Sequence, residues 1–212
     1  MEIIGIIDYG SGNIHSATKA FETVTRDFKK EIKIMRVANA AEINDCDRIV
    51  LPGVGAFKDC KAGLSYVDDL FPSLEKKILE KGVPFLGICV GMQLLADEGF
   101  EGQKTAGFGW VPGVVDKIPT VPGIKIPHMG WNNVNQSKDH PLWFNIENNS
   151  RFYSVHSYYV KPVNQDCVFG TTNYGHEFVS AIALDNVFAV QFHPEKSQSD
   201  GLQLLSNFVN WS

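Results

Sequence analysis

Cys89 is the residue whose surroundings most strongly indicate chemistry. It follows the apolar run 83–88, stands between Gly87 and Gly91, and precedes apolar residues at helical spacing. This order is typical of a nucleophile elbow, in which glycines let the chain turn tightly and present a nucleophile where a helix begins. A helix N-terminus favours the thiolate, the nucleophilic form of cysteine. We therefore predict that Cys89 is a nucleophile rather than a small buried hydrophobic side chain.

Two neighbours of Cys89 are predicted to serve the same reaction. The backbone N–H of Val90 would point toward an oxyanion formed on a substrate that Cys89 attacks. Gln93 lies four residues after Cys89 and shares a face of the predicted helix with it. We predict that Val90 contributes to an oxyanion hole and that Gln93 contacts the substrate.

A thiol nucleophile needs a base, and the segment 187–195 offers one. In a strand, His193 and Glu195 share one parity and project to the same side, about 7 Å apart. Pro194 lacks a ladder donor and is expected to end that strand. We predict that His193 accepts the thiol proton and that Glu195 orients the imidazole. Without Cys89, a strand-end histidine beside a solvated glutamate would be the simpler interpretation.

A third segment, 51–57, follows another predicted strand and contains two glycines. The carboxyl ends of parallel strands form the edge where ligands bind in open α/β sheets. We predict that Gly53 and Val54 supply the second oxyanion donor and that Gly55 lines the substrate pocket. A plain strand-to-helix turn explains this segment equally well when it is considered alone.

The elements around these segments alternate in the first half of the chain. Apolar runs predict buried strands at 3–7, 31–37, 48–51 and 83–88, and helical spacing predicts helices at 14–24 and 74–82. The first strand should lead into a turn at Gly10 and Gly12, which lacks the third glycine of a dinucleotide fingerprint. Short apolar strands between helices predict a mostly parallel central sheet flanked by helices.

The second half has a different pattern. Residues 99–149 are rich in Gly, Pro and Asn, with short strand-like pieces around Val114 and Ile124. Closely spaced strand patterns then predict hairpins at 151–160, 167–174, 178–184 and 187–192. A last helix is predicted at 201–211. The chain is therefore expected to form one α/β domain over residues 1–212, with an additional antiparallel portion.

Composition excludes several classes of protein. The 212 residues carry 19 basic and 24 acidic side chains, and a net charge of −5 argues against a nucleic-acid binder. No apolar run is long enough for a membrane span. The four cysteines form no C-x-x-C motif, so neither a zinc ribbon nor a redox pair is expected. They are too sparse for a disulfide scaffold, and a reducing cytoplasm is the predicted location. The histidines other than His193 have no metal-ligand spacing, so no metal is expected.

The cysteine, histidine and glycine segments together resemble those of the class I (triad) glutamine amidotransferases. The motifs narrow this resemblance to the glutaminase subunits of imidazole glycerol phosphate synthase, over nearly the full chain. The matching segments are IDYGSGNIHS (7–16), LPGVGAF (51–57), GICVGMQLL (87–95), PHMGWN (127–132), YSVHSYY (153–159) and QFHPEKSQ (191–198).

This resemblance implies a flavodoxin-like fold and a glutaminase reaction. Cys89 would attack the side-chain amide of L-glutamine to give a thioester and ammonia, and water would then release glutamate. Backbone groups of His156, Ser157 and Tyr158 would contact the glutamine. Ammonia would pass to a separate TIM-barrel cyclase subunit of a heterodimer, which makes imidazole glycerol phosphate and aminoimidazole carboxamide ribotide in histidine biosynthesis. No metal or organic cofactor is implied.

The segment PHMGWN is expected to face that cyclase subunit. Exposed Met129 and Trp131 would suit the core of an interface; the alternative is that Trp131 fills the core of its own domain. The residues assigned to this interface are Pro127, His128, Met129, Gly130, Trp131 and Asn132.

Three alternatives to this function remain open. A paralogous glutaminase would feed ammonia to a different synthase, because the glutaminase motifs report only the reaction that releases ammonia. A stand-alone cysteine amidase would use the same catalytic residues without a partner. An idle regulatory or binding module would retain the fold without the activity.

Overall fold

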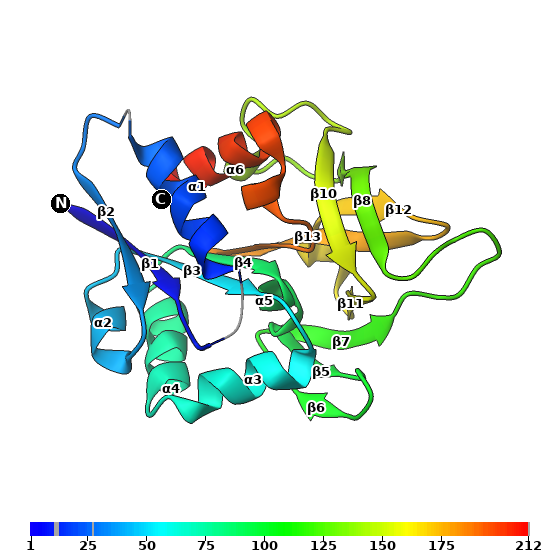
Figure 1. The fold of residues 1–212 in the computed structure, drawn as a ribbon, viewed down its shortest axis with the longest axis horizontal. Coiled ribbons are helices and arrows are strands. Elements are labelled where there is room, and N and C mark those ends of the chain that lie inside the picture. Colours follow the sequence, from blue (N-terminus) through cyan, green and yellow to red (C-terminus); the bar gives the residue numbers. More distant parts are fainter. Residues whose placement is uncertain (11–12, 27, 212) are drawn as a thin grey trace.

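The computed structural model describes residues 1–10, 13–26 and 28–211 (Figure 1). An eight-stranded sheet forms its centre, in the order β2-β1-β3-β4-β14-β13-β12-β9. The first five strands run parallel to one another. Their bounds are Ile32–Val37 (β2), Glu2–Ile7 (β1), Arg48–Gly53 (β3), Phe85–Cys89 (β4) and Val187–Val190 (β14).

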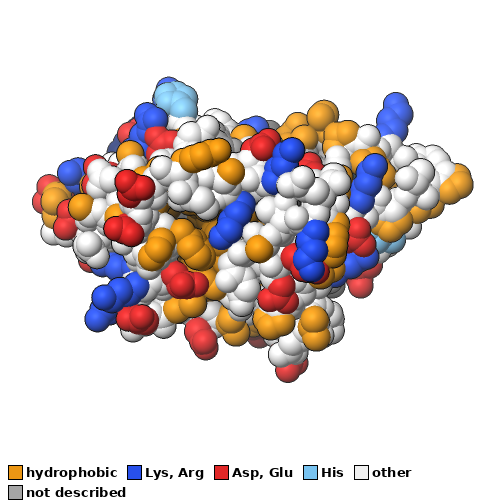
Figure 2. Space-filling view, turned by 90° about the horizontal axis from the view of Figure 1, so that it is seen from below, with side chains coloured by type: hydrophobic (Ala, Val, Ile, Leu, Met, Phe, Trp, Pro, Cys, Tyr) orange, Lys and Arg blue, Asp and Glu red, His pale blue; other side chains and the backbone are white. Residues whose placement is uncertain are grey.

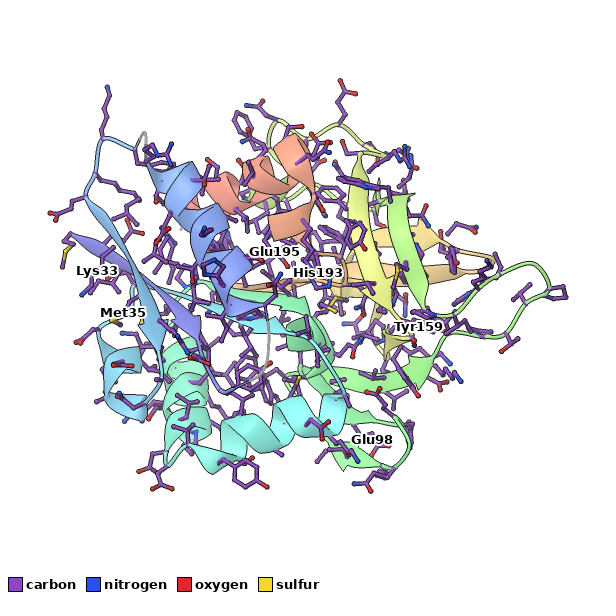
Figure 3. The ribbon with its side chains drawn as sticks, in the orientation of Figure 1. Lys33, Met35, Glu98, Tyr159, His193 and Glu195 are labelled. Carbon is purple, nitrogen blue, oxygen red and sulfur yellow. The ribbon has the colours of Figure 1, made fainter. Side chains whose placement is uncertain are left out.

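These parallel strands agree within two residues with the predicted apolar runs. Every residue of β3, β4 and β14 is buried, as expected for strands covered on both faces. Strand β2 lies at the edge of the sheet, where Lys33 is exposed (Figure 3); a charged side chain at an edge disfavours pairing with another chain. The α/β fold class is therefore confirmed. Gly12 lies outside the described residues.

Helices cover the sheet on both sides in Figure 1. Helices α1 (Ile14–Thr25) and α6 (Gln198–Asn210) lie side by side on one face. There the rings of Phe21 and Phe208 pack edge to face, with their centroids 6.1 Å apart. The other face carries α3 (Phe57–Tyr66) and α4 (Leu70–Glu75), and α4 continues into a π-helical turn at Lys76–Glu80. Helices α3 and α2 (Ala40–Asn44) were not predicted.

Antiparallel strands extend the sheet beyond β14. They are β13 (Glu177–Leu184), β12 (Val168–Asn173) and the short β9 (Asn135–Gln136). The predicted hairpins at 167–174, 178–184 and 187–192 are confirmed. The prediction of one domain over the full chain stays a prediction.

Two smaller sheets stand beside the large one. The first pairs β10 (Arg151–His156) with β8 (His128–Asn133), and the second has the order β11-β7-β5-β6. The bounds of the second sheet are Tyr158–Pro162 (β11), Val111–Lys117 (β7), Ala96–Gly99 (β5) and Thr105–Ala106 (β6).

The predicted strand 151–160 is wrong as a single element, because the chain changes sheets at Ser157. Residues before Ser157 pair with β8, and residues after it pair with β7. The Ser157 carbonyl accepts a hydrogen bond from the Ile118 N–H at 2.9 Å. The strand-like piece around Val114 is confirmed as β7, but the piece at Ile124 is a turn closed by an N–H to the Val121 carbonyl at 3.1 Å.

On the face seen in Figure 2, acidic and basic side chains are interspersed. None of the helices in the described part of the chain is long and apolar enough to cross a membrane.

Candidate active site

The carboxyl ends of three parallel strands meet at one edge of the large sheet. Gly53 at the end of β3 is the register partner of Cys89 at the end of β4. On the other side of β4, Val190 at the end of β14 pairs with Ile88. The chain that follows β14 carries His193. The sheet thus gathers all three predicted segments, as an open α/β sheet gathers ligand-binding groups at this edge.

Cys89 has the strained backbone of a nucleophile elbow. Its φ is +55° and its ψ is −110°, a conformation that non-glycine residues rarely adopt and that folded proteins retain at functional sites. A side chain at Gly91 would collide with the Leu51 carbonyl oxygen, and one at Gly87 would approach the Gly91 carbonyl oxygen within 2.9 Å. Both glycines are therefore needed for the close approach of β3, β4 and the turn.

The helix after Cys89 is a single turn that ends two residues before Leu95, the last residue of the predicted helical pattern. Helix α5 spans only Val90–Gln93, because the next carbonyls bond elsewhere: Leu94 accepts from the Phe108 N–H at 2.7 Å and Leu95 from the Val111 N–H at 2.9 Å. One helical turn supplies only a small dipole. The backbone turn and His193 therefore contribute more to the environment of the thiol than a helix does.

His193 and Glu195 lie side by side near the middle of the molecule (Figure 3). Nδ1 of His193 is 2.8 Å from Oε1 of Glu195, and both side chains are at most 2% exposed. Their pairing does not arise from strand parity, because β14 ends at Val190 and a 3₁₀ turn at Pro194–Lys196 brings the two side chains together.

The turn that holds His193 is tied on several sides. The His193 N–H donates to the Tyr153 carbonyl at 2.8 Å. The Ser197 hydroxyl donates to the His193 carbonyl at 2.6 Å and accepts from the Tyr153 N–H at 2.9 Å. The rings of Phe152 and Phe192 pack against each other with their centroids 4.2 Å apart. Strand β10 therefore fixes the backbone from which the imidazole projects.

The environment of His193 favours its protonated form. Burial lowers the pKa of His193, but interactions with Cys89 and Glu195 outweigh burial and raise this pKa to about 10. Among the described residues, the buried Nε2 of His193 has no hydrogen-bond partner, and hydrogen bonds between catalytic groups are often formed only when substrate binds. An imidazolium at this position would stabilise a thiolate at Cys89.

A cavity of about 260 Å³ opens above the thiol. It brings together predicted substrate and oxyanion residues from three separate segments. The lining residues are Val54, Gly55, Cys89, Val90, Gln93, Glu101, Pro127, Val155, His156, Ser157 and Tyr158.

Gly53 does not line the cavity. It packs under the elbow, where a side chain would come within 2.9 Å of the Gly91 nitrogen and the Tyr9 hydroxyl. Val54 and Gly55 therefore form the lining part of this loop. Pro127, assigned to the partner surface, is exposed and also lines the cavity.

Sequence reasoning missed Glu101. It lies in the glycine-rich middle of the chain, where no periodic pattern indicated its neighbours. One oxygen of its carboxylate accepts from the Phe57 N–H at 2.7 Å. Because Glu101 also lines the cavity, it supplies a carboxylate to that lining, in addition to the ionisable groups of Cys89, His193 and Glu195 at the site.

The segment PHMGWN alternates along β8 as a strand must. Met129 is 63% exposed and Trp131 is 37% exposed, so Trp131 does not fill the core. His128 is buried, and its assignment as a side chain facing a partner needs correction, because its parity turns the ring toward His156. Gly130 and Asn132 are half-buried, and Asn132 donates to the Asn173 carbonyl at 2.9 Å.

Two further cysteines lack the surroundings of a nucleophile. Burial raises the pKa of Cys46 to about 12, and burial also raises the pKa of Cys167. Within residues 1–10, 13–26 and 28–211, no cluster of His, Cys, Asp and Glu has the arrangement of a metal site.

Comparison with known proteins agrees with this geometry. The family described as glutamine amidotransferase class-I matches residues 5–211. The chain is 46% identical over 212 residues to the imidazole glycerol phosphate synthase subunit HisH of Mesorhizobium japonicum, with 98% of each chain covered. It is 44% identical to the protein of the same name from Rhodospirillum rubrum, with 99% of each chain covered.

Solved structures share the fold at low sequence identity. A glutamine amidotransferase matches with a TM-score of 0.70 at 15% identity, covering 98% of this chain and 97% of the other. A glutamine amidotransferase of Thermotoga maritima matches with a TM-score of 0.62 at 17% identity, covering 92% and 76%.

Proposed function

The chain belongs to the class I glutamine amidotransferase family, and we propose that it is the glutaminase subunit of an imidazole glycerol phosphate synthase in histidine biosynthesis. The identity of 44–46% to HisH subunits over almost the full chain supports this function. The observation that carries the chemistry is the strained Cys89 beside the buried His193–Glu195 pair, at the floor of a cavity.

The proposed reaction has two halves. The Cys89 thiolate attacks the side-chain amide carbon of glutamine, and His193 donates its proton to the departing nitrogen, so that ammonia and a γ-glutamyl thioester form. His193 then accepts a proton from water, which attacks the thioester and releases glutamate. Glu195 holds the imidazole through Nδ1 and stabilises its charge.

The oxyanion of each half-reaction needs N–H donors near the thiol. We assign this role to the backbone of Val90 and of the Gly53–Val54 loop, which adjoins Cys89 through the β3–β4 register. The Glu101 carboxylate is suited to the ammonium group of glutamine, and the backbone of His156, Ser157 and Tyr158 to its other α-substituents. Gly55 and Gln93 complete the wall of the pocket.

Ammonia released here needs an acceptor enzyme, because free ammonia is mostly protonated at neutral pH and is then no longer a nucleophile. We propose that a separate TIM-barrel cyclase subunit takes it up in a heterodimer. The exposed side chains of Met129 and Trp131 on β8 provide an apolar surface for that contact. The cytoplasm stays the predicted location.

A glutaminase assay with and without a cyclase subunit and its ligand tests this function. We expect slow glutamate release by the chain alone and a clear increase in the complex. High activity without a partner would instead support a stand-alone amidase. Stimulation only by a different synthase would support a paralogue, and silence in every state would support an idle module.

A further inference from the structure

Gln191 is a buried polar residue to which the proposed reaction assigns no role. It follows β14, lies two residues before His193 and is 1% exposed. The backbone N–H of Gln191 donates to the Ser180 carbonyl at 2.9 Å, and this hydrogen bond fixes the Gln191 backbone against β13. Burying a side-chain amide is costly unless each polar end finds a partner, so the contacts of both ends are informative.

The orientation of Gln191 follows from one backbone carbonyl. The Tyr158 carbonyl can only accept, so the end of the Gln93 amide that lies 3.0 Å from it must be the NH₂ group. That same NH₂ group is 3.1 Å from the Gln191 amide, which must therefore present its oxygen there. The NH₂ group of Gln191 is left to face the Cys89 sulfur at 3.7 Å.

Two histidines hold the Tyr158 carbonyl in place. His156 donates through Nδ1 to this carbonyl at 2.9 Å, and its Nε2 then accepts from Nδ1 of His128 at 3.1 Å. Nε2 of His128 lies 3.3 Å from the Asn132 amide. Burial lowers the pKa of His156 to about 3 and that of His128 to about 4, so both rings stay neutral at pH 7. A neutral ring has one donor and one acceptor, as this chain of contacts requires.

The orientation has consequences at both ends of the Gln191 side chain. Both donors of the Gln93 amide are used, by Tyr158 and Gln191, so its oxygen is the atom left for the cavity that Gln93 lines. At the other end, an N–H directed at sulfur stabilises a thiolate more than a thiol, because hydrogen bonds to ionised groups are the stronger ones.

We propose that Gln191 is a positioning residue for the nucleophile: its amide donates to the Cys89 sulfur and, through its oxygen, holds Gln93 with an acceptor facing the substrate. This inference rests on the proposed nucleophilic role of Cys89. Gln191 forms no bond in the reaction and takes no proton.

The test is the pH dependence of alkylation of Cys89 by iodoacetamide, followed by mass spectrometry of the Cys89 peptide in the full chain. Gln191→Met keeps the length of the side chain but removes both polar ends. We expect the midpoint of its profile to move up by about one pH unit, and alkylation below the midpoint to slow about tenfold. His193, Glu195, Glu101 and His156, the ionisable groups around Cys89, are the same in both proteins.

Ser180→Ala is the matched control. Ser180 is the neighbour of Gln191 on β13, is 1% exposed, and its hydroxyl has no partner among the described residues. Its removal disturbs the same strand pair without touching the amide chain, and we expect the wild-type profile. In the complex, Gln191→Met should lower kcat for glutamine about tenfold, whereas Ser180→Ala should not.

A second variant covers the case in which Gln191→Met does not fold. Gln191→Glu keeps the shape and the acceptor for Gln93 but places a carboxylate beside the sulfur, so its midpoint should rise at least as far. An unchanged midpoint in either folded variant would overturn the role of Gln191 and leave the proposed function intact. A wild-type Cys89 that reacts no faster than Cys46 or Cys167 would overturn the nucleophile itself, and this inference with it.

Discussion

The buried His193 beside Cys89 differs in charge from the buried pair His128 and His156, of which His156 lines the cavity. On the side of the parallel strands, His193 stands between a thiol and a carboxylate, and its pKa is raised to about 10. On the side of the two-stranded sheet, His128 and His156 contact each other, a backbone carbonyl and an amide, and burial lowers their pKa values to about 4 and about 3.

The difference shows what burial does with and without an anionic partner. Burial alone removes the charge of an imidazole, whereas an adjacent carboxylate and thiol restore it. We call Cys89, His193 and Glu195 the reactive wall, and His128, His156 and Tyr158 the holding wall. Changes in the reactive wall should act mainly on kcat, and changes near the holding wall on KM, partner binding and stability.

The largest effect is expected from Cys89→Ala. Loss of the nucleophile should lower glutamate release by about 10⁴-fold or more, while the far-UV circular dichroism spectrum stays that of the wild type. Cys167→Ala is the control, since burial raises the pKa of this thiol and it lies outside the cavity. Residual turnover near the wild-type rate in Cys89→Ala would refute the thioester mechanism.

Glu195→Gln should have the next largest effect. The substitution keeps the shape of the side chain but removes the charge that orients and stabilises the His193 imidazolium, so kcat should fall by about 10²-fold or more. The measurement is steady-state glutaminase activity in the complex. If kcat changed less than twofold while KM rose, Glu195 would belong to substrate binding instead.

Trp131→Ala tests the outer face of the strand whose inner face carries His128. Truncating an aromatic anchor of an interface core should weaken the complex by about 10- to 100-fold, as measured by titration calorimetry with the cyclase subunit. Phe144→Ala removes another exposed aromatic side chain, 66% exposed and outside β8, and should leave affinity unchanged. Equal affinities for both variants would place the interface elsewhere.

Glu101→Gln separates binding from chemistry. The new amide oxygen can still accept from the Phe57 N–H, but the negative charge in the cavity is lost. We expect KM for glutamine to rise about tenfold with kcat nearly unchanged. Glu98→Gln is the control, because Glu98 pairs with Lys104 at the surface (Figure 3). A fall in kcat alone would contradict an ammonium-binding role.

The smallest effect concerns acid stability. His128 and His156 have lower pKa values in the folded chain than the unfolded value of about 6.5, so the unfolded chain binds more protons between these values. Stability should therefore fall as the pH drops from about 6.5 toward about 4. Urea midpoints at pH 7 and pH 5 measure this loss. Replacing His128 by Asn should reduce it, whereas replacing the exposed His15 by Asn should not.

His193 should act on stability with the opposite sign. Its folded pKa is raised, so its contribution is complete below about pH 6.5 and is lost as the pH rises toward about 10. The measurement is the urea midpoint of the wild type and of His193→Asn between pH 7 and pH 10. If the wild-type midpoint stayed constant and the two proteins had the same pH dependence, the protonated state of His193 in the reactive wall would be contradicted.

The parallel strands could be predicted from the sequence because the central ones, β3, β4 and β14, are buried on both faces. A continuous apolar run such as 83–88 is then sufficient to identify the strand, and the glycines around Cys89 indicate the turn. Residues 96–136 lack this signal. Strands β5, β6, β8 and β9 are short or half-exposed, and their pairing depends on partners distant in the chain. Glu101 was missed for that reason.

The sequence by itself determined the chemistry: a cysteine between glycines at a strand end, a His-Pro-Glu segment more than 100 residues later, and motifs specific enough to indicate a family. Only the tertiary structure decided how those groups meet. A 3₁₀ turn rather than strand parity pairs His193 with Glu195. Hydrogen bonds from distant backbone end α5 after one turn, and the Tyr158 carbonyl orients Gln93 and Gln191. These contacts join segments far apart in the chain, so no local pattern can encode them.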